Sequence, residues 1–174
     1  SQEPQDFVTK FELPYMPLLD AGVKFYAALG NHDKQTNRFY KPWNMNGERY
    51  FGYSKRNAKF IVLDSVYMDP KQLDWLESTL KTAREDWKIV YFHHPLYSSG
   101  GRHGSEADLR LLLEPLFLKY GVNVVYSGHD HIYERIKPQN GISYFVSGAA
   151  GQLRKGNLTK TNLTAAGFDQ DLSF

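Results

Sequence analysis

Histidines gather in three short motifs, and each motif directly follows an apolar run of the sequence. The motifs are 30-GNHD-33, 93-HHP-95 and 128-GHDH-131, and they hold five of the six histidines. Neutral imidazole is the commonest metal ligand among protein side chains. A glycine beside a ligand lets the backbone come close to whatever is bound. The residue types and their placement therefore predict a metal site built from three separate loops.

The donor atoms indicate which metals such a site would prefer. Asn31 offers an amide oxygen, His93 a ring nitrogen, and His129 and His131 two more nitrogens on either side of Asp130. The chain has no cysteine, which excludes disulfides, thiolate ligands and cysteine nucleophiles. Oxygen and imidazole donors without sulfur suit Mn, Fe or Zn and argue against a structural zinc site.

Each motif alone also has a simpler interpretation. A lone histidine such as His94 or His103 is more often a surface or core residue, and one His-X-His pair can arise by chance. Asp33 could cap a turn, and Asn31 after a glycine is ordinary turn chemistry. The metal hypothesis depends on the conjunction of three motifs, each at the end of an expected strand.

Apolar periodicity and breaker residues predict the elements that carry these motifs. Helices are expected over residues 6–22, 69–83 and 105–121, with Asp69 as the N-cap of the second. A hairpin turn is expected at residues 55–58, a long loop over 148–167 and the start of a strand over 168–174. The remaining strands are expected over residues 23–29, 48–54, 59–65, 87–92, 122–127, 132–137 and 142–147.

This alternation of strands and helices predicts a mixed α/β fold in which helices cover the sheet. Ligands of open α/β sheets bind beyond the carboxyl ends of the strands. We therefore expect the three histidine motifs to converge on one site.

Composition limits the classes of protein that remain. The 174 residues suffice for one domain, and a net charge of +2 does not indicate nucleic acid or an anionic membrane as a partner. No apolar run approaches the roughly 18–20 residues that span a bilayer. Residues 1–10 lack the features of a signal peptide, and the chain has no initiating Met, so we expect a processed or excised piece of a longer protein.

The motifs resemble those of the calcineurin-like metallophosphoesterases and, within them, the purple acid phosphatase branch. That family carries Asp-X-His, Gly-Asp-X-X-Asp or Tyr, Gly-Asn-His-Asp or Glu, a strand-ending His, and Gly-His-X-His, in this order. The last three match 30-GNHD-33, His93 and 128-GHDH-131. The similarity extends over nearly the whole chain and includes 72-QLDWLESTL-80 and 98-SSGGRHGS-105. It implies a β-sandwich flanked by helices, in the layer order α/β/β/α.

The resemblance also implies the ligands of a dinuclear centre. Asn31, His93 and His129 would bind one metal ion, and His131 would bind the other. Two divalent or trivalent ions (Fe, Mn or Zn), about 3.5–4 Å apart, would activate a water molecule. The resulting hydroxide would attack a phosphate monoester in line, without a covalent enzyme intermediate.

Three further residues would act on the substrate, a small phosphoester, if the resemblance holds. His32 would face the phosphate as a hydrogen-bond donor or general acid, and Asp33 would orient it. His103, in 102-RHG-104, would contact the substrate.

The first two family motifs are missing, because nothing before Gly30 reads as either of them. Those motifs supply the bridging carboxylate and most ligands of one metal, so His131 alone would remain for that ion. We therefore expect residues 1–174 to be a single incomplete metallophosphoesterase domain, its larger C-terminal part, truncated at both ends. Such a chain would hold one ion or none and would be weakly active or inactive.

Two other functions remain open from the sequence. The chain could be a non-catalytic binding or scaffold relative, or a phosphodiesterase. It offers no basic groove and no aromatic platform for nucleic acid. Export to the periplasm or the extracellular space is suggested by the resemblance alone. Asn157 and Asn162 each begin an Asn-X-Thr sequon, which matters only in a glycosylating pathway.

Overall fold

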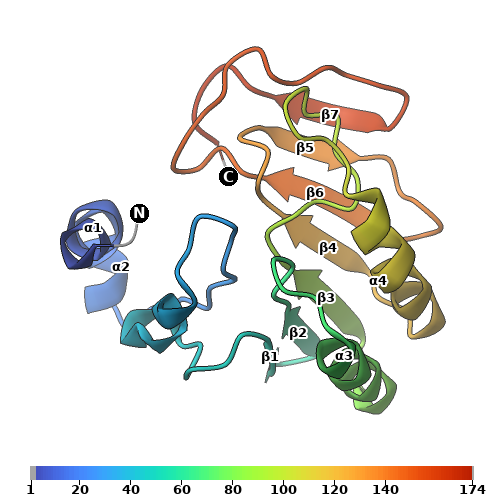
Figure 1. Cartoon of the computed structure of the whole chain (residues 1–174), viewed down its shortest axis with the longest axis horizontal. Coiled ribbons are helices and arrows are strands. Elements are labelled where there is room, and N and C mark those ends of the chain that lie inside the picture. The colour runs from blue at the N-terminus through green and yellow to red at the C-terminus, as the bar shows by residue number, and fades with distance from the viewer. Residues whose placement is uncertain (1–2, 174) are drawn as a thin grey trace.

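Seven strands form one mixed sheet in the computed structural model, which describes residues 3–173. Their order across the sheet is β1-β2-β3-β4-β6-β5-β7 (Figure 1). The strands are β1 (Phe51–Lys55), β2 (Ala58–Val62), β3 (Trp87–Tyr91), β4 (Val124–Ser127), β5 (Tyr133–Ile136), β6 (Ser143–Ser147) and β7 (Thr164–Phe168).

The four strands β2, β3, β4 and β6 run parallel to one another, whereas β1, β5 and β7 are antiparallel to the strands they pair with. Parallel strands end at the same edge of a sheet, so the segments after β3 and β4 emerge side by side. Those segments contain His93 and His129, and this arrangement brings the two histidine motifs together.

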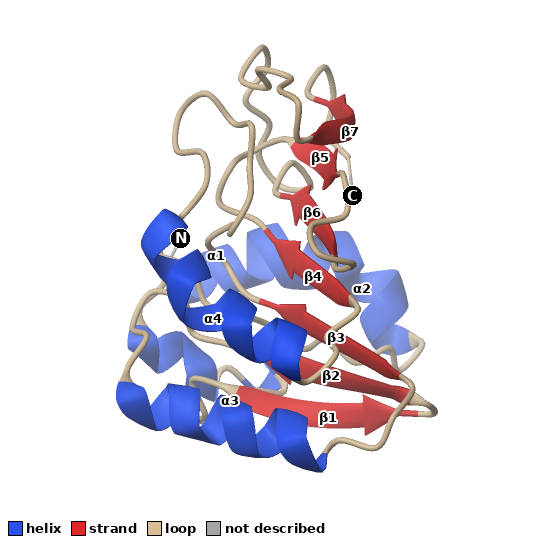
Figure 2. Cartoon of the chain, turned by 90° about the vertical axis from the view of Figure 1, so that its right-hand side faces the viewer, coloured by secondary structure: helices blue, strands red, loops and turns tan. Residues whose placement is uncertain are grey.

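Two helices, α3 (Pro70–Thr82) and α4 (Ala107–Lys119), cover the same face of the sheet (Figure 2). Asp69 caps α3, because its Oδ1 accepts a hydrogen bond of 2.8 Å from the backbone N–H of Gln72. Apolar side chains of both layers form the core, among them Ile61, Leu76, Leu80, Val90, Leu113, Phe117, Val125 and Tyr144.

The N-terminal segment is helical and lies on the opposite side of the sheet from α3 and α4 (Figures 1 and 2). It comprises α1 (Pro4–Phe7), a π-helical turn (Val8–Glu12) and α2 (Leu13–Asp20), followed later by 3₁₀ turns at Gln35–Phe39 and Lys41–Trp43. Phe11 packs edge-on against Phe25 and Trp43, at ring-centroid distances of 5.0 and 6.1 Å. These aromatic contacts attach the helical segment to the loops that follow it.

The α/β class and most of the expected elements are confirmed. The hairpin, both central helices, and the strands near residues 87, 122, 132 and 142 all occur, each within a few residues of its expected bounds. The described residues form one sheet, so the second sheet of the expected sandwich is not among them.

Two predictions of local structure were wrong. Residues 23–29 form no strand, because the Tyr26 carbonyl accepts from the Tyr91 hydroxyl and the Ala27 N–H donates to the Trp43 carbonyl. The segment expected to be a loop contains β7, which pairs with β5 and ends at Phe168 instead of starting there. Residue 174 lies outside the described residues.

The face of the sheet away from α3 and α4 is rich in aromatic residues. In register across five strands lie Phe51, Val62, Tyr91, Tyr126 and Phe145. Residues 23–30 cover this row near β1–β3, where Tyr26 stacks on Tyr53 at 4.0 Å. Farther along the same row, on β4, the Tyr126 side chain is 42% exposed.

Candidate metal centre

Three loops bring donor atoms together at the carboxyl ends of β3 and β4. The Nε2 of His93 lies 2.9 Å from Oδ1 of Asn31 and 3.0 Å from Nδ1 of His129. His93 is 62 positions from Asn31 and 36 positions from His129 in the sequence, so the convergence is a product of the fold. The structure thus places three of the four expected metal ligands around one centre.

Close backbone contacts hold the loops in this arrangement. The Gly128 N–H donates to the His93 carbonyl at 2.9 Å, which ties one loop to the other. A Cβ at position 30 would lie only 2.6 Å from Nδ1 of His93, so the Asn31 loop needs a glycine there. His129 has a φ of 66° in the left-handed region, which costs energy for a residue with a side chain.

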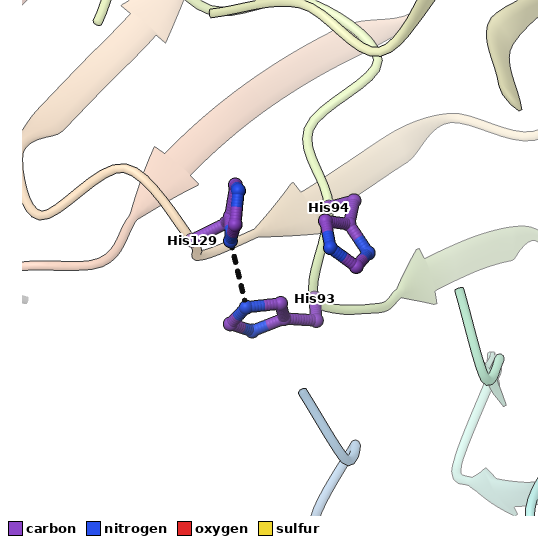
Figure 3. Close-up of side chains that lie close together, drawn as sticks. All are labelled: His93, His94 and His129. Atoms are coloured by element: carbon purple, nitrogen blue, oxygen red, sulfur yellow. Dashed lines mark hydrogen bonds between the residues drawn. The ribbon is translucent and has the colours of Figure 1, made fainter. Parts of the chain in front are cut away.

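His94, for which the sequence indicated no role, also belongs to the cluster. One nitrogen from each of His93, His94 and His129 lies within 4.8 Å of the others. The three rings converge where the two loops meet (Figure 3). No sequence pattern singled out His94, because a second histidine after a strand end is as compatible with a surface position.

Burial and mutual repulsion keep these imidazoles neutral. Burial lowers the pKa of His93 to about 3, and the neighbouring charges of His94 and His129 add to the effect. The pKa of His129 falls to about 4 for the same reasons. Neutral rings have lone pairs available, which is the state in which histidine binds a metal ion.

His131, the fourth expected ligand, lies outside this tight group. Its Nδ1 is buried and finds no hydrogen-bond partner among residues 3–173. Burial lowers the pKa of His131, and the charges of Arg154 and His103 lower it further. A buried ring nitrogen without a partner is compatible with a ligand, and the role of His131 in binding a second ion stays a prediction.

The expected substrate-facing residues lie at the surface of the site. The His103 ring packs 4.1 Å from the His129 ring, centroid to centroid, and His32 is exposed. Asp33 accepts hydrogen bonds from the Gly30 N–H at 2.9 Å and from Asn37 Nδ2 at 3.0 Å. These contacts correspond to the turn-capping interpretation of Asp33, and its orienting action on His32 stays a prediction.

Asp130, between the two histidines of its motif, is fully buried. Its Oδ2 accepts from the Ser98 hydroxyl at 2.6 Å and from the Gly104 N–H at 3.1 Å. These two donors flank the loop that carries His103. The Asp130 carboxylate therefore anchors the His103 loop, which sequence analysis did not identify because the contacts span 26 to 32 residues.

Glu134 anchors the same loop from β5 and is also fully buried. Its Oε2 accepts from the Ser99 N–H at 2.7 Å, and its Oε1 accepts from the Thr164 hydroxyl at 2.6 Å. Asp130 and Glu134 thus both hold loops, although Oδ1 of Asp130 is buried and has no hydrogen-bond partner among the described residues. Neither belongs to the cluster of potential metal ligands in the described part of the chain.

The clustered donors fit one metal ion. Ligand atoms around a tetrahedral zinc ion with bonds of about 2.0–2.1 Å lie about 3.3 Å apart, close to the separations of 2.9 and 3.0 Å at His93. The nitrogen donors are uncharged, and Asn31 adds a neutral oxygen. A second ion would need donors beyond this cluster.

A comparison with protein families identifies the class of protein to which this fold and site belong. A profile of the calcineurin-like phosphoesterases matches residues 3–133, and the chain belongs to that family. Its curated relatives lie in the purple acid phosphatase branch, as the sequence indicated. It is 41% identical over 160 residues to tartrate-resistant acid phosphatase type 5 of Oryctolagus cuniculus. It is 36% identical over 120 residues to Fe(3+)-Zn(2+) purple acid phosphatase 12 of Arabidopsis thaliana.

The rabbit match covers 73% of this chain and 49% of the relative, and the Arabidopsis match covers 63% and 26%. The chain thus spans about half the length of the rabbit relative and about a quarter of the length of the Arabidopsis relative. Solved structures share the fold. An anchor protein of the inner membrane complex of Plasmodium superposes with a TM-score of 0.67 at 23% identity, covering 84% of this chain and 55% of that one. A purple acid phosphatase from yellow lupin seeds gives 0.64 at 21% identity, covering 72% and 27%.

Proposed function

We propose that this chain carries the metal centre of a phosphoesterase that hydrolyses small phosphate monoesters. The observation that supports it most is the convergence of Asn31 and His129 on Nε2 of His93, at 2.9 and 3.0 Å, from three separate loops. Membership of the calcineurin-like phosphoesterases agrees with this reading.

In this proposal each group has a defined task. Asn31, His93 and His129 hold the ion, and His131 serves a second ion where further ligands are present. A bound ion would neutralise phosphate charge and lower the pKa of a water molecule. His32 donates a hydrogen bond to the leaving-group oxygen, and His103, beside the His129 ring, contacts the phosphate. Asp130 and Glu134 keep the His103 loop in position.

We further propose that residues 1–174 form one metallophosphoesterase domain that lacks two of the family's ligand motifs. Without those carboxylates the charge of a divalent ion is poorly offset, so one weakly held ion and low activity are expected. The clustered ligands of the described residues are all uncharged, which agrees with this expectation. Export of the protein remains a proposal that depends on the resemblance. No helix of the described chain is long and apolar enough to cross a membrane.

The second candidate is a non-catalytic binding or scaffold protein of the same fold. The same absence of carboxylates from the described cluster favours it, since loss of metal ligands removes activity before it removes the fold. One solved structure with this fold is an anchor in the inner membrane complex of Plasmodium.

Turnover of p-nitrophenyl phosphate by the chain, purified without a polyhistidine tag, tests the proposal. Activity should be low, should be abolished by a chelator, and should return on adding Zn²⁺, Mn²⁺ or Fe²⁺. His129→Ala, prepared identically, controls for contaminating phosphatase. Equal rates for wild type and His129→Ala, with metal bound only by the wild type, would favour the non-catalytic candidate. Faster cleavage of bis(p-nitrophenyl) phosphate would indicate a diesterase.

A further inference from the structure

We propose that His94 is itself a metal ligand, and that His93, His94 and His129 form a three-imidazole site for one borderline divalent ion such as Zn²⁺ or Co²⁺. The inference extends the proposed metal centre and depends on it. It adds a ligand that no sequence motif indicated.

The geometry places His94 as close to the centre as the expected ligands. A nitrogen of each ring lies within 4.8 Å of the other two. The His94 ring centroid is 4.9 Å from that of His93 and 4.5 Å from that of His129. Nitrogens around a tetrahedral ion lie roughly 3.3 Å apart, which is within the 4.8 Å that bounds the ligand atoms of the cluster.

Ser65 holds the His94 ring through its Nδ1 nitrogen, an arrangement that is common among histidines that bind metal ions. The Ser65 hydroxyl lies 3.0 Å from Nδ1 of His94, and the same oxygen accepts the His94 backbone N–H at 3.0 Å. A hydroxyl oxygen can accept two hydrogen bonds, so Nδ1 can donate the second. That tautomer leaves the lone pair on Nε2. Metal-binding histidines commonly use one nitrogen for the ion and the other for such a hydrogen bond.

Three carboxylates near the cluster accept hydrogen bonds from other groups. Asp64, which follows β2, accepts from Arg49 Nη1 at 3.3 Å and from the Val66 N–H at 3.0 Å. Asp130 holds the His103 loop, and Asp33 closes the turn after Gly30. The ligand atoms of the cluster itself are all imidazole nitrogens, which favours Zn²⁺, Co²⁺, Ni²⁺ or Cu²⁺ over Mg²⁺ or Ca²⁺.

Metal titration of the untagged chain, without substrate, tests the role of His94. Zn²⁺ affinity is measured by competition with a chromophoric chelator, and Co²⁺ binding by its visible absorption. His94→Ala should weaken both by about tenfold or more, and Ser65→Ala by a smaller factor. Leu111→Gln changes an exposed residue of α4 that lies outside the cluster, and this variant should bind both ions as the wild type does.

X-ray absorption of the wild-type Zn²⁺ complex gives a reading that needs no variant, and three coordinated imidazoles are expected. Two imidazoles, or His94→Ala binding as tightly as wild type, would overturn the role of His94 and leave the metal centre standing. A wild type that binds no Zn²⁺ or Co²⁺ while its circular dichroism is that of a folded α/β protein would overturn both proposals.

Discussion

His93 lies in the middle of the candidate site, and its surroundings explain why it stays uncharged. Asn31 and His129 contact one ring nitrogen, and Gly30 packs against the other side of the ring. A proton on His93 would place a positive charge beside two other imidazoles in a partly buried position. The same environment that excludes the proton leaves a lone pair for a cation.

The stability of the metal-free chain should therefore depend on pH. The folded-state pKa values of His93 and His129, about 3 and about 4, lie below the ordinary value of 6.5. At a pH between the folded-state pKa values and 6.5, the unfolded chain binds protons that the folded chain does not. The free energy of unfolding therefore falls as the pH falls from about 6.5 toward about 4. Urea denaturation in EDTA at several pH values measures this slope.

His93→Gln provides the control for this prediction, because glutamine does not titrate. Its stability should change less steeply than that of the wild type between pH 6.5 and the range where carboxylates begin to titrate. Parallel curves for the two proteins would mean that the His93 ring is protonated in the folded chain as easily as in the unfolded one.

At the scale of elements, the loop of residues 98–104 depends on a side chain from another part of the chain. Asp130→Ala would leave the Ser98 hydroxyl and the Gly104 N–H without their acceptor. Each buried donor without a partner costs about 1–3 kcal/mol. We expect lower stability in urea and faster trypsin cleavage after Arg102, which lies in this loop.

Two comparisons make the result specific to the loop. Asp130→Asn keeps one acceptor oxygen and should lie between wild type and Asp130→Ala. Cleavage after Arg56, in the exposed turn between β1 and β2, should be unchanged while the protein remains folded. If both sites open equally, Asp130 stabilises the whole domain and does not act mainly on the loop.

Elements that depend on nearby residues could be predicted from the sequence. Asp69 followed by Pro70 starts α3 through contacts within one turn, and residues 55–58 close a hairpin between adjacent strands. Residues 23–29 show the limit, because an apolar run becomes a strand only when a neighbouring strand offers backbone groups. β7 was missed because its pairing with β5 joins residues about thirty positions apart.

The site shows the same division. Asn31, His93 and His129 could be proposed from motifs because each follows an apolar run. The contributions of His94, Asp130 and Glu134 depend on loops that meet only in the folded chain. Their partners, such as Ser65 for His94 and Ser98 for Asp130, lie 29 and 32 residues away.

The whole molecule has two unlike faces. Helices α3 and α4 bury one face of the sheet, whereas the other shows aromatic side chains, including Trp87 at 50% and Tyr126 at 42% exposure. Extended apolar surface of this kind binds hydrophobic dyes and promotes self-association. We expect the folded chain to enhance the fluorescence of anilinonaphthalene sulfonate.

The double variant Trp87→Gln/Tyr126→Gln should lower this fluorescence. Leu111→Gln/Leu112→Gln removes exposed apolar side chains from α4, on the other side of the molecule, and should change it little. Both variants are compared at equal folded content by circular dichroism. If the α4 variant lowers dye binding more, the dye does not report on the aromatic face.

The hydrogen bonds of the central strands continue into the loops that carry the histidines. The Phe92 N–H donates to the Tyr126 carbonyl, and the Gly128 N–H donates to the His93 carbonyl, so the β3–β4 ladder runs up to the candidate ligands. Local fluctuations that fray the N-terminal helices or the edge strands leave this ladder closed. The histidines therefore keep their arrangement until the middle of the sheet itself opens, and a partly unfolded chain would retain its capacity for a cation.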